Sequence, residues 1–286
     1  MYDTYLKKLE EIGKLRNLKP RTIQTYQNNI GSFLAWANKN PESLTCEDAR
    51  DFLIYLQSQG RTPATLNNKN AAMVFFYKRV LHKPWDDELV PRAINDHPIP
   101  RILSRKEVEL LLAATGDLKY KAMFAIMYSA GLRVSEVIHL HYEDISRSNM
   151  QIYVRETKTR MDRYAILSKR TLDLLTEYWF ACGRPKSVLF PNKFTGEYLT
   201  ISTVEQAMRR SASSAGLSGK VTPHCLRHSF ATHLLENGVD IRYIQALLGH
   251  LRPRSTEIYL HVSNKTIMGI RSPFDCCMKE EGEPHE

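Results

Sequence analysis

The sequence lacks the features of a membrane-embedded, secreted or repetitive protein. No run of about 18 apolar residues occurs, so a membrane-spanning helix is not expected. The N-terminus has no basic segment followed by an apolar stretch, which argues against a secretory signal. We find no internal repeat and no low-complexity tract. With 43% hydrophobic and 25% charged residues, the composition is that of an ordinary globular protein.

Cysteine is scarce, and its spacing is uninformative. The chain has five cysteines, at positions 46, 182, 225, 276 and 277. None forms a Cys-x-x-Cys pair, and the number is odd. A disulfide framework and a zinc knuckle are therefore disfavoured, and a reducing cytoplasm is the expected location.

Basic residues outnumber acidic ones, and their distribution is uneven. The net charge of the chain is +9, with +3 in residues 1–99, +9 in residues 100–277 and −3 in the last nine residues. A basic body suits a polyanionic partner, because contact with phosphates releases counterions. Charge alone favours the plainer interpretation, a basic protein that has no such partner.

The length of 286 residues favours two domains. Residues 1–85 show helical periodicity interrupted by turn signals, which predicts an all-α domain of four helices. Residues 86–100 are rich in proline and poor in periodic apolar residues, which predicts a linker. Residues 101–277 form the second predicted domain, and residues 278–286 form an acidic tail.

The second domain has a mixed pattern. Ser104 and Glu107 form a capping-box motif at the start of its first helix. The sequence pattern predicts the two strands of a hairpin at residues 150–154 and 163–167, joined by an exposed, charged loop. The expected fold class is therefore mainly α with a small β-sheet, an α+β domain that follows an all-α domain. Its helices are predicted near residues 105–114, 118–130, 134–140, 171–181, 202–215, 223–237 and 240–248.

The first chemical motif joins two helices. Gly131 ends an apolar helix, and Glu136 lies in the first turn of the next. Arg133, between them, could offer a planar fork of donors to a phosphate, with Glu136 holding its guanidinium from behind. An ordinary helix cap with a surface ion pair explains the same residues.

The second motif opens another helix. Thr222 is a good N-cap and is followed by Pro223. His224 and Arg227 then share one face beside the unpaired N–H groups of the helix start, which favours an anion site. A zinc site is a weaker alternative, because the nearby histidines are spaced unfavourably and no carboxylate shares their face.

Two further motifs lie in a helix end and a loop. Gly249 ends a helix, so that His250 is exposed, and Tyr259 follows nine residues later. A tyrosine nucleophile needs a positively charged site, because its ordinary pKa is about 10. Lys158 lies in the charged hairpin loop. Each has a plain alternative: a core tyrosine, a capping histidine and a solvated lysine.

Taken together, these residues resemble the active-site set of the tyrosine recombinases, the phage integrase family that includes the Xer proteins. The resemblance rests on the order and spacing of Arg133, Lys158, His224-x-x-Arg227, His250 and Tyr259. Residues 4–80 resemble the family's helical core-binding domain, and residues 101–275 its catalytic domain. The turn after His250 is more basic than is usual in the family, and the loop around Lys158 lacks the frequent glycines.

The resemblance implies a mechanism and an architecture. The two domains would close on DNA as a C-shaped clamp. Tyr259 would attack a DNA phosphodiester to give a 3′-phosphotyrosyl link, with no metal, nucleotide or other cofactor required. Arg133 and Arg227 would hold the non-bridging oxygens, and Glu136 would orient Arg133. The remaining expected roles are leaving-group acid for Lys158, general base for His224 and phosphate hydrogen-bond donor for His250.

The expected partner is double-stranded DNA with a specific recombination site, bound by a homo-oligomer that acts as a tetramer on two sites. An accessory DNA-bending protein is compatible with this assembly. Integration or excision of a mobile element and Xer-type resolution would use the same residues. Two alternatives stay open: a type IB topoisomerase-like enzyme and an inactive DNA-binding regulator. The apolar segment after Tyr259 would pack on a neighbouring subunit or fold back on its own domain, and the resemblance favours the neighbouring subunit.

Overall fold

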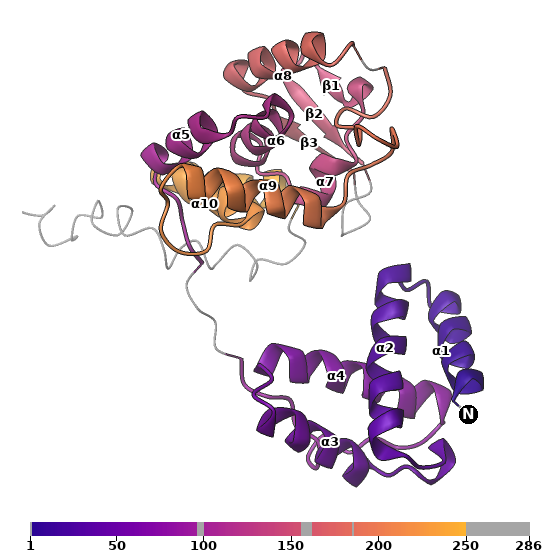
Figure 1. Cartoon of the computed structure of the whole chain (residues 1–286). Coiled ribbons are helices and arrows are strands. Elements are labelled where there is room, and N and C mark those ends of the chain that lie inside the picture. The colour runs from indigo at the N-terminus through magenta and orange to yellow at the C-terminus, as the bar shows by residue number, and fades with distance from the viewer. Residues whose placement is uncertain (1, 96–99, 156–161, 185, 250–286) are drawn as a thin grey trace, which may run out of the picture. The chain divides into compact units, whose positions relative to one another are not determined.

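The computed structural model describes residues 2–95, 100–155, 162–184 and 186–249 (Figure 1). The chain divides into two compact units, Met1–Pro98 and Ile99–Glu286. Within the described ranges, no helix has both the length and the apolar character needed to cross a membrane.

In the described part of the first unit all regular elements are helices, as the sequence predicted. Proline occupies the first turn of two of its helices, where a missing N–H costs nothing. Thr62 accepts a hydrogen bond from the backbone N–H of Thr65 and so caps one of them. The elements are α1 (Asp3–Leu15), α2 (Pro20–Ala37), η1 (Pro41–Ser43), α3 (Cys46–Ser58), α4 (Pro63–Phe75) and the π-helical turn η2 (Phe76–Val80).

The proline-rich segment after η2 packs partly on this unit. Trp85 and Val90 are buried and belong to its hydrophobic core. The side chain of Asn67 donates to the carbonyl of Ala93 at 2.8 Å and accepts from its N–H at 2.9 Å. Asn70 donates to the carbonyl of Val90 at 3.2 Å. These amide side chains supply the partners that a non-helical backbone needs, so the segment is ordered as far as Ala93 without forming a helix.

The second unit is a helical domain with one small sheet. Its elements are α5 (Arg105–Ala114), α6 (Leu118–Ser129), α7 (Val134–Ile138), η3 (Tyr142–Asp144), β1 (Ile145–Ser146), β2 (Gln151–Val154), β3 (Arg163–Ile166), α8 (Lys169–Ala181), α9 (Ile201–Ser214), α10 (Pro223–Glu236) and α11 (Ile241–Leu248). The predicted fold class, a mainly α protein with a small β-sheet, is confirmed.

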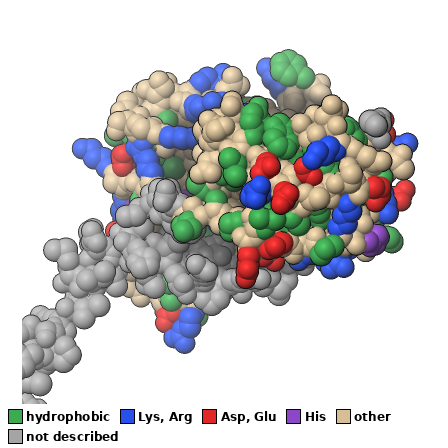
Figure 2. Space-filling model, turned by 90° about the horizontal axis from the view of Figure 1, so that it is seen from below, with side chains coloured by type: hydrophobic (Ala, Val, Ile, Leu, Met, Phe, Trp, Pro, Cys, Tyr) green, Lys and Arg blue, Asp and Glu red, His purple; other side chains and the backbone are tan. Residues whose placement is uncertain are grey.

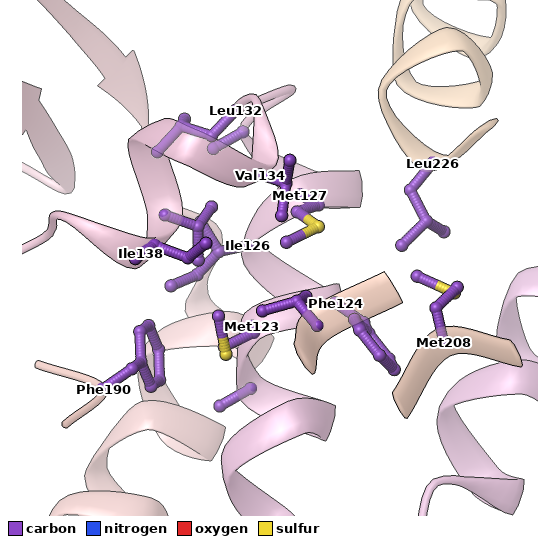
Figure 3. Close-up of a cluster of buried hydrophobic side chains, with 14 of the residues drawn as sticks. Met123, Phe124, Ile126, Met127, Leu132, Val134, Ile138, Phe190, Met208 and Leu226 are labelled. Carbon is purple, nitrogen blue, oxygen red and sulfur yellow. The ribbon is translucent and has the colours of Figure 1, made fainter. Parts of the chain in front are cut away.

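Helix α6 lies at the centre of this unit. All six residues from Ala122 to Met127 are buried, so the helix is surrounded by protein on every side. It packs against α8 and α10, and its methionine and phenylalanine side chains meet Met208 of α9, Leu226 of α10 and Phe190 (Figure 3). Because α6 is fixed by this core, the junction that follows it has a rigid support.

The sheet has three antiparallel strands in the order β1-β2-β3. Ile152 pairs with Ala165, and both are buried, whereas Tyr164 on the other face is exposed. The strands β2 and β3 form the predicted hairpin. Met150 has a left-handed backbone with φ of 51°, so β2 begins one residue later than predicted. β1 was not predicted, because two residues are too few to show a periodicity.

Charge of both signs is present on the surface. Figure 2 shows Lys and Arg side chains interspersed with Asp and Glu side chains on the face in view, with apolar side chains between them. The positive charge of the chain is therefore not a uniform field on this face.

Candidate active site

The junction between α6 and α7 carries the first two predicted site residues. Gly131 has φ of 65°, and a Cβ there would lie 2.4 Å from Cδ1 of Phe230, so only glycine fits. Arg133 precedes the first residue of α7. Its backbone N–H donates to Oε2 of Glu136 at 2.8 Å, and its Nη1 donates to Oε1 at 2.8 Å. The predicted Arg133–Glu136 pair is therefore formed, and it is mostly buried.

Arg227 comes from α10, whose first residue is Pro223, with Thr222 before it as predicted. Its side chain is only 5% exposed. Nη1 donates to the carbonyl of Gly131 at 2.7 Å, and Nη2 donates to the carbonyl of Leu248 at 2.7 Å. Nη1 also lies 3.7 Å from Oε2 of Glu136. Arg133 and Arg227, 94 positions apart in the sequence, thus meet at one carboxylate.

A third guanidinium binds the same carboxylate. Arg163 on β3 donates from Nη1 to Oε1 of Glu136 at 3.0 Å and from Nη2 to Oε2 at 2.8 Å. Its Nε donates to the carbonyl of Leu247 at 2.9 Å. We call Arg133, Glu136, Arg163 and Arg227 the Glu136 cluster. Three of its side chains are less than 10% exposed, while Arg133 is 19% exposed.

The electrostatics of the cluster keep the carboxylate ionised. Burial raises the pKa of Glu136, but the hydrogen bonds and charge of Arg163, with the N–H and charge of Arg133, outweigh it and lower the pKa to about 2. Glu136 is therefore a fixed negative charge at neutral pH, surrounded by three fixed positive charges.

Two histidines lie in the first two turns of α10. His224 is exposed at the second position of the helix, one turn before Arg227. His228 is largely buried. Burial, with the nearby positive charges of His224 and Arg227, lowers the pKa of His228 to about 4. His228 is thus neutral near pH 7.

Three predicted site residues, Lys158, His250 and Tyr259, lie outside the described residues. The elements that precede or flank them are described. β2 and β3 flank the loop of Lys158, and β3 carries Arg163. Helix α11 ends at Leu248, and Gly249 adopts a left-handed conformation directly before His250. Arg163 and Arg227 hold the last two carbonyls of α11, so both flanking elements are tied to the Glu136 cluster.

Chemically, the cluster is suited to an oxyanion. Within the part of the chain that the structure describes, it combines three guanidiniums with one carboxylate, and the side chain of Arg133 has no partner other than Glu136. Planar guanidinium groups match the geometry of phosphate oxygens. Across the described ranges, no three His, Cys, Asp or Glu side chains are grouped so that they could hold a metal ion.

Comparison with known proteins assigns the chain to a family. Residues 101–266 match the phage integrase family, and residues 5–87 match the N-terminal SAM-like domain of phage integrases. The chain belongs to the phage integrase family, and it is a site-specific recombinase that breaks and rejoins DNA.

Similar proteins carry names that agree with this class. The chain is 36% identical over 270 residues to y4qK of Sinorhizobium fredii, named as an integrase/recombinase, with 94% of this chain and 87% of the other covered. It is 31% identical over 275 residues to tyrosine recombinase XerD of Lacticaseibacillus casei, covering 89% and 92%. A lambda integrase dimer bound to a COC′ core site has a similar fold, with a TM-score of 0.73, 19% identity and coverage of 94% and 98%.

One member of the cluster was not among the predicted site residues. The sequence places Arg163 at the start of the second strand of the hairpin, and it is a candidate, with Arg160, only if Lys158 has no catalytic role. Its partners lie 27 and 84 positions away, at Glu136 and Leu247. The sequence shows that Arg163 begins a strand next to the Lys158 loop. That position does not indicate which residues its side chain contacts.

Proposed function

We propose that Tyr259 is the nucleophile of this recombinase and that the Glu136 cluster binds the scissile phosphate. The Tyr259 hydroxyl attacks phosphorus, the bond to the 5′ oxygen breaks, and a 3′-phosphotyrosyl link forms. The released 5′ hydroxyl of a partner strand then attacks this link and frees the tyrosine. One ester replaces another at each step, so bond energy is retained.

The observation that carries the proposal is the meeting of Arg133 and Arg227 at Glu136. Negative charge builds on the non-bridging oxygens in the transition state, and preorganised guanidiniums stabilise it. Glu136 orients Arg133 through two hydrogen bonds of 2.8 Å. Arg227 is held rigid by two carbonyls.

Proton transfer is assigned to residues near the phosphate. We propose that His224 accepts the proton of Tyr259 and that Lys158 protonates the leaving 5′ oxygen. His250 donates a hydrogen bond to the phosphate. The exposure of His224 at the start of α10 supports its part, because a general base must reach the substrate.

We further propose the organisation in which this site acts. Residues 1–85 form the core-binding domain, 86–100 the linker, 101–277 the catalytic domain and 278–286 an acidic tail. The partner is double-stranded DNA with a specific site, bound by four subunits across two sites, with an accessory DNA-bending protein as a further partner. Exchange of four strands requires four nucleophiles if each subunit supplies one. The reaction takes place in the cytoplasm and serves integration or excision of a mobile element or Xer-type resolution.

The test is covalent trapping on a nicked suicide substrate. The native protein is expected to form a phosphotyrosyl adduct, and Tyr259→Phe is expected to form none while its DNA affinity changes less than about threefold, because only one hydroxyl is lost. Tyr243→Phe is the matched control, since Tyr243 is an exposed tyrosine of α11 and is expected to leave the adduct unchanged. An adduct formed by Tyr259→Phe would refute the assignment.

A further inference from the structure

We propose that Arg163 is a positioning residue for strand cleavage: it is the counter-ion of Glu136, and it thereby leaves the charge and donors of Arg133 for the DNA phosphate. This inference rests on the proposed function. It concerns a residue that does not itself touch DNA in this account and that acts through its neighbours.

Of the arginines that hydrogen-bond to Glu136 through their side chains, Arg163 makes more of these bonds than Arg133. Arg163 binds Glu136 with two parallel bonds, Nη1 to Oε1 at 3.0 Å and Nη2 to Oε2 at 2.8 Å. This is the fork-to-fork arrangement that fixes the plane of a carboxylate. Arg133 has a single side-chain bond to the same group, from Nη1. Nε and Nη2 of Arg133 have no hydrogen-bond partner in the described part of the structure, so they are available to a ligand.

The charge balance leads to the same conclusion. With Arg163 present, the pair of Arg163 and Glu136 is neutral, and the positive charges of Arg133 and Arg227 remain. Without Arg163, the nearest cation to Glu136 is Arg133, and their pair would be neutral instead. One positive charge at the phosphate site would then be cancelled. Since buried charge interactions are screened less than surface ones, this change would be felt strongly.

Stability alone does not explain three guanidiniums around one carboxylate. Removing charges from water is costly, and a single arginine would satisfy the charge of Glu136. Arg227 is held in addition by the carbonyls of Gly131 and Leu248, whereas the side chain of Arg133 bonds only to Glu136 among the described residues. A phosphate oxygen would give the remaining donors of Arg133 a partner.

Arg163 also connects the hairpin to the end of α11. Its Nε donates to the carbonyl of Leu247 at 2.9 Å, and its Cδ would lie 3.1 Å from a Cβ at Gly249. A cation at the C-terminus of a helix is favourable, because the last carbonyls carry partial negative charge. Loss of Arg163 would therefore disturb both neighbours of the site, and a test must separate this structural effect from the charge effect.

A second substitution separates the two effects, because it can reverse the charge effect of the first but not its structural effect. First-strand cleavage is measured on a suicide substrate at saturating protein for the native chain, Arg163→Met, Glu136→Gln and the double variant, with DNA affinity and unfolding by urea alongside. We expect Arg163→Met to slow cleavage about 10- to 100-fold, with DNA affinity within about threefold. In the native background, Glu136→Gln slows cleavage because Arg133 loses its orienting partner.

The decisive comparison is Glu136→Gln in the Arg163→Met background. There it removes the uncompensated carboxylate, so we expect cleavage at least about fivefold faster than in Arg163→Met alone. A double variant no faster than Arg163→Met would overturn the proposal and leave Arg163 a structural residue. If Arg163→Met does not fold, Arg163→Gln takes its place, because glutamine keeps a hydrogen-bond donor without the charge. Adding Glu136→Gln to Arg163→Gln is expected to speed cleavage in the same way. If it does not, the proposal is equally refuted.

The matched control is Arg155→Met, at the residue that follows β2, whose last residue Val154 pairs with Arg163. Arg155 forms ion pairs with Glu143 at 2.6 Å and with Asp144 at 2.7 Å and makes no contact with Glu136. We expect its cleavage rate to stay within about twofold of the native rate. A native chain that forms no covalent adduct at all would refute the proposed function, whereas an active native chain without the reversal refutes only the role of Arg163.

Discussion

Two ionic clusters, one that includes Arg163 at the start of β3 and one that includes Arg155 directly after β2, differ in burial and in charge balance. At the Glu136 cluster, three guanidiniums surround one carboxylate, and Glu136 is 4% exposed. At Arg155, one guanidinium, 48% exposed, faces the two carboxylates of Glu143 and Asp144. The first cluster carries a net charge of +2 and the second a net charge of −1.

The difference supports the proposal that the Glu136 cluster binds an anionic ligand. The pair of Arg155 and Glu143 is exposed on both sides, so water screens it and it contributes little to stability. Asp144 is buried, but it also accepts a hydrogen bond from the N–H of His141 at 2.8 Å, so it does not depend on Arg155 alone. A buried excess of positive charge has no such screening, and it persists only if the fold or a ligand compensates it. The comparison therefore predicts large effects of substitution in the Glu136 cluster and small ones elsewhere.

The largest effect is expected for Arg227→Ala. It removes a buried guanidinium that holds the carbonyls of Gly131 and Leu248 and that we propose to bind the scissile phosphate. We expect cleavage to fall at least about 10³-fold and the free energy of unfolding by about 3–5 kcal/mol. Single-turnover cleavage and urea unfolding check both values.

Arg184→Ala is the control for Arg227→Ala, because Arg184 lies over the ring of the exposed Phe180, 4.9 Å from its centre. Its cleavage rate is expected within about twofold of native. If the cleavage rate of Arg227→Ala stays within tenfold of the native rate, the Glu136 cluster is no more important for cleavage than residues outside it, and the comparison fails.

The next effect is a loss of stability on acidification in two separate windows. The pKa of His228 is about 4 in the folded chain and 6.5 ordinarily, so the unfolded chain takes up the proton first and stability falls between about pH 6.5 and 4. The pKa of Glu136 is about 2 against 4.5, so its contribution is present above pH 4.5 and is lost between about pH 4.5 and 2.

Each window corresponds to about 3 kcal/mol. Urea unfolding as a function of pH measures both. His228→Asn should remove the pH dependence of the free energy of unfolding only between about pH 6.5 and 4. Glu136→Gln should remove it only between about pH 4.5 and 2. If either variant keeps the full slope of its window, the assignment of that slope is wrong.

A smaller effect is expected for Gly131→Ala, which acts on the support of the cluster. Its left-handed backbone and the contact of 2.4 Å with Phe230 both oppose a Cβ. We expect a loss of about 2 kcal/mol in the free energy of unfolding. Gly116→Ala, where a Cβ would meet nothing within 4 Å, should change it by less than about 0.5 kcal/mol. Equal losses in the two variants would contradict the account.

Much of the fold was predictable because its signals are local. Pro20 and Pro63 open helices, Ser104 and Glu107 form the expected capping box, and Gly249 ends α11. These features depend on residues within one turn of each other, so the sequence displays them directly.

What was missed depends on distant contacts. The order of the proline-rich segment rests on Asn67 and Asn70, more than 19 positions before their partners. The position of Arg163 depends on β3 lying beside both α7 and the end of α11. The Arg133–Glu136 pair, three positions apart, was predicted from the same kind of local signal as the caps. The tertiary partners of a side chain have no local signal, and this is why the third arginine was not seen.

The central claim, that the Glu136 cluster stabilises charge on the scissile phosphate, is tested most directly by removing that charge from the DNA. Cleavage by the native chain and by Arg133→Ala is compared on a phosphodiester and on a substrate with a neutral methylphosphonate at the scissile position. We expect Arg133→Ala to be at least about 10²-fold slower than native on the phosphodiester and within about tenfold on the methylphosphonate, which has one negative charge fewer throughout the reaction. An equal loss on both substrates would contradict the account.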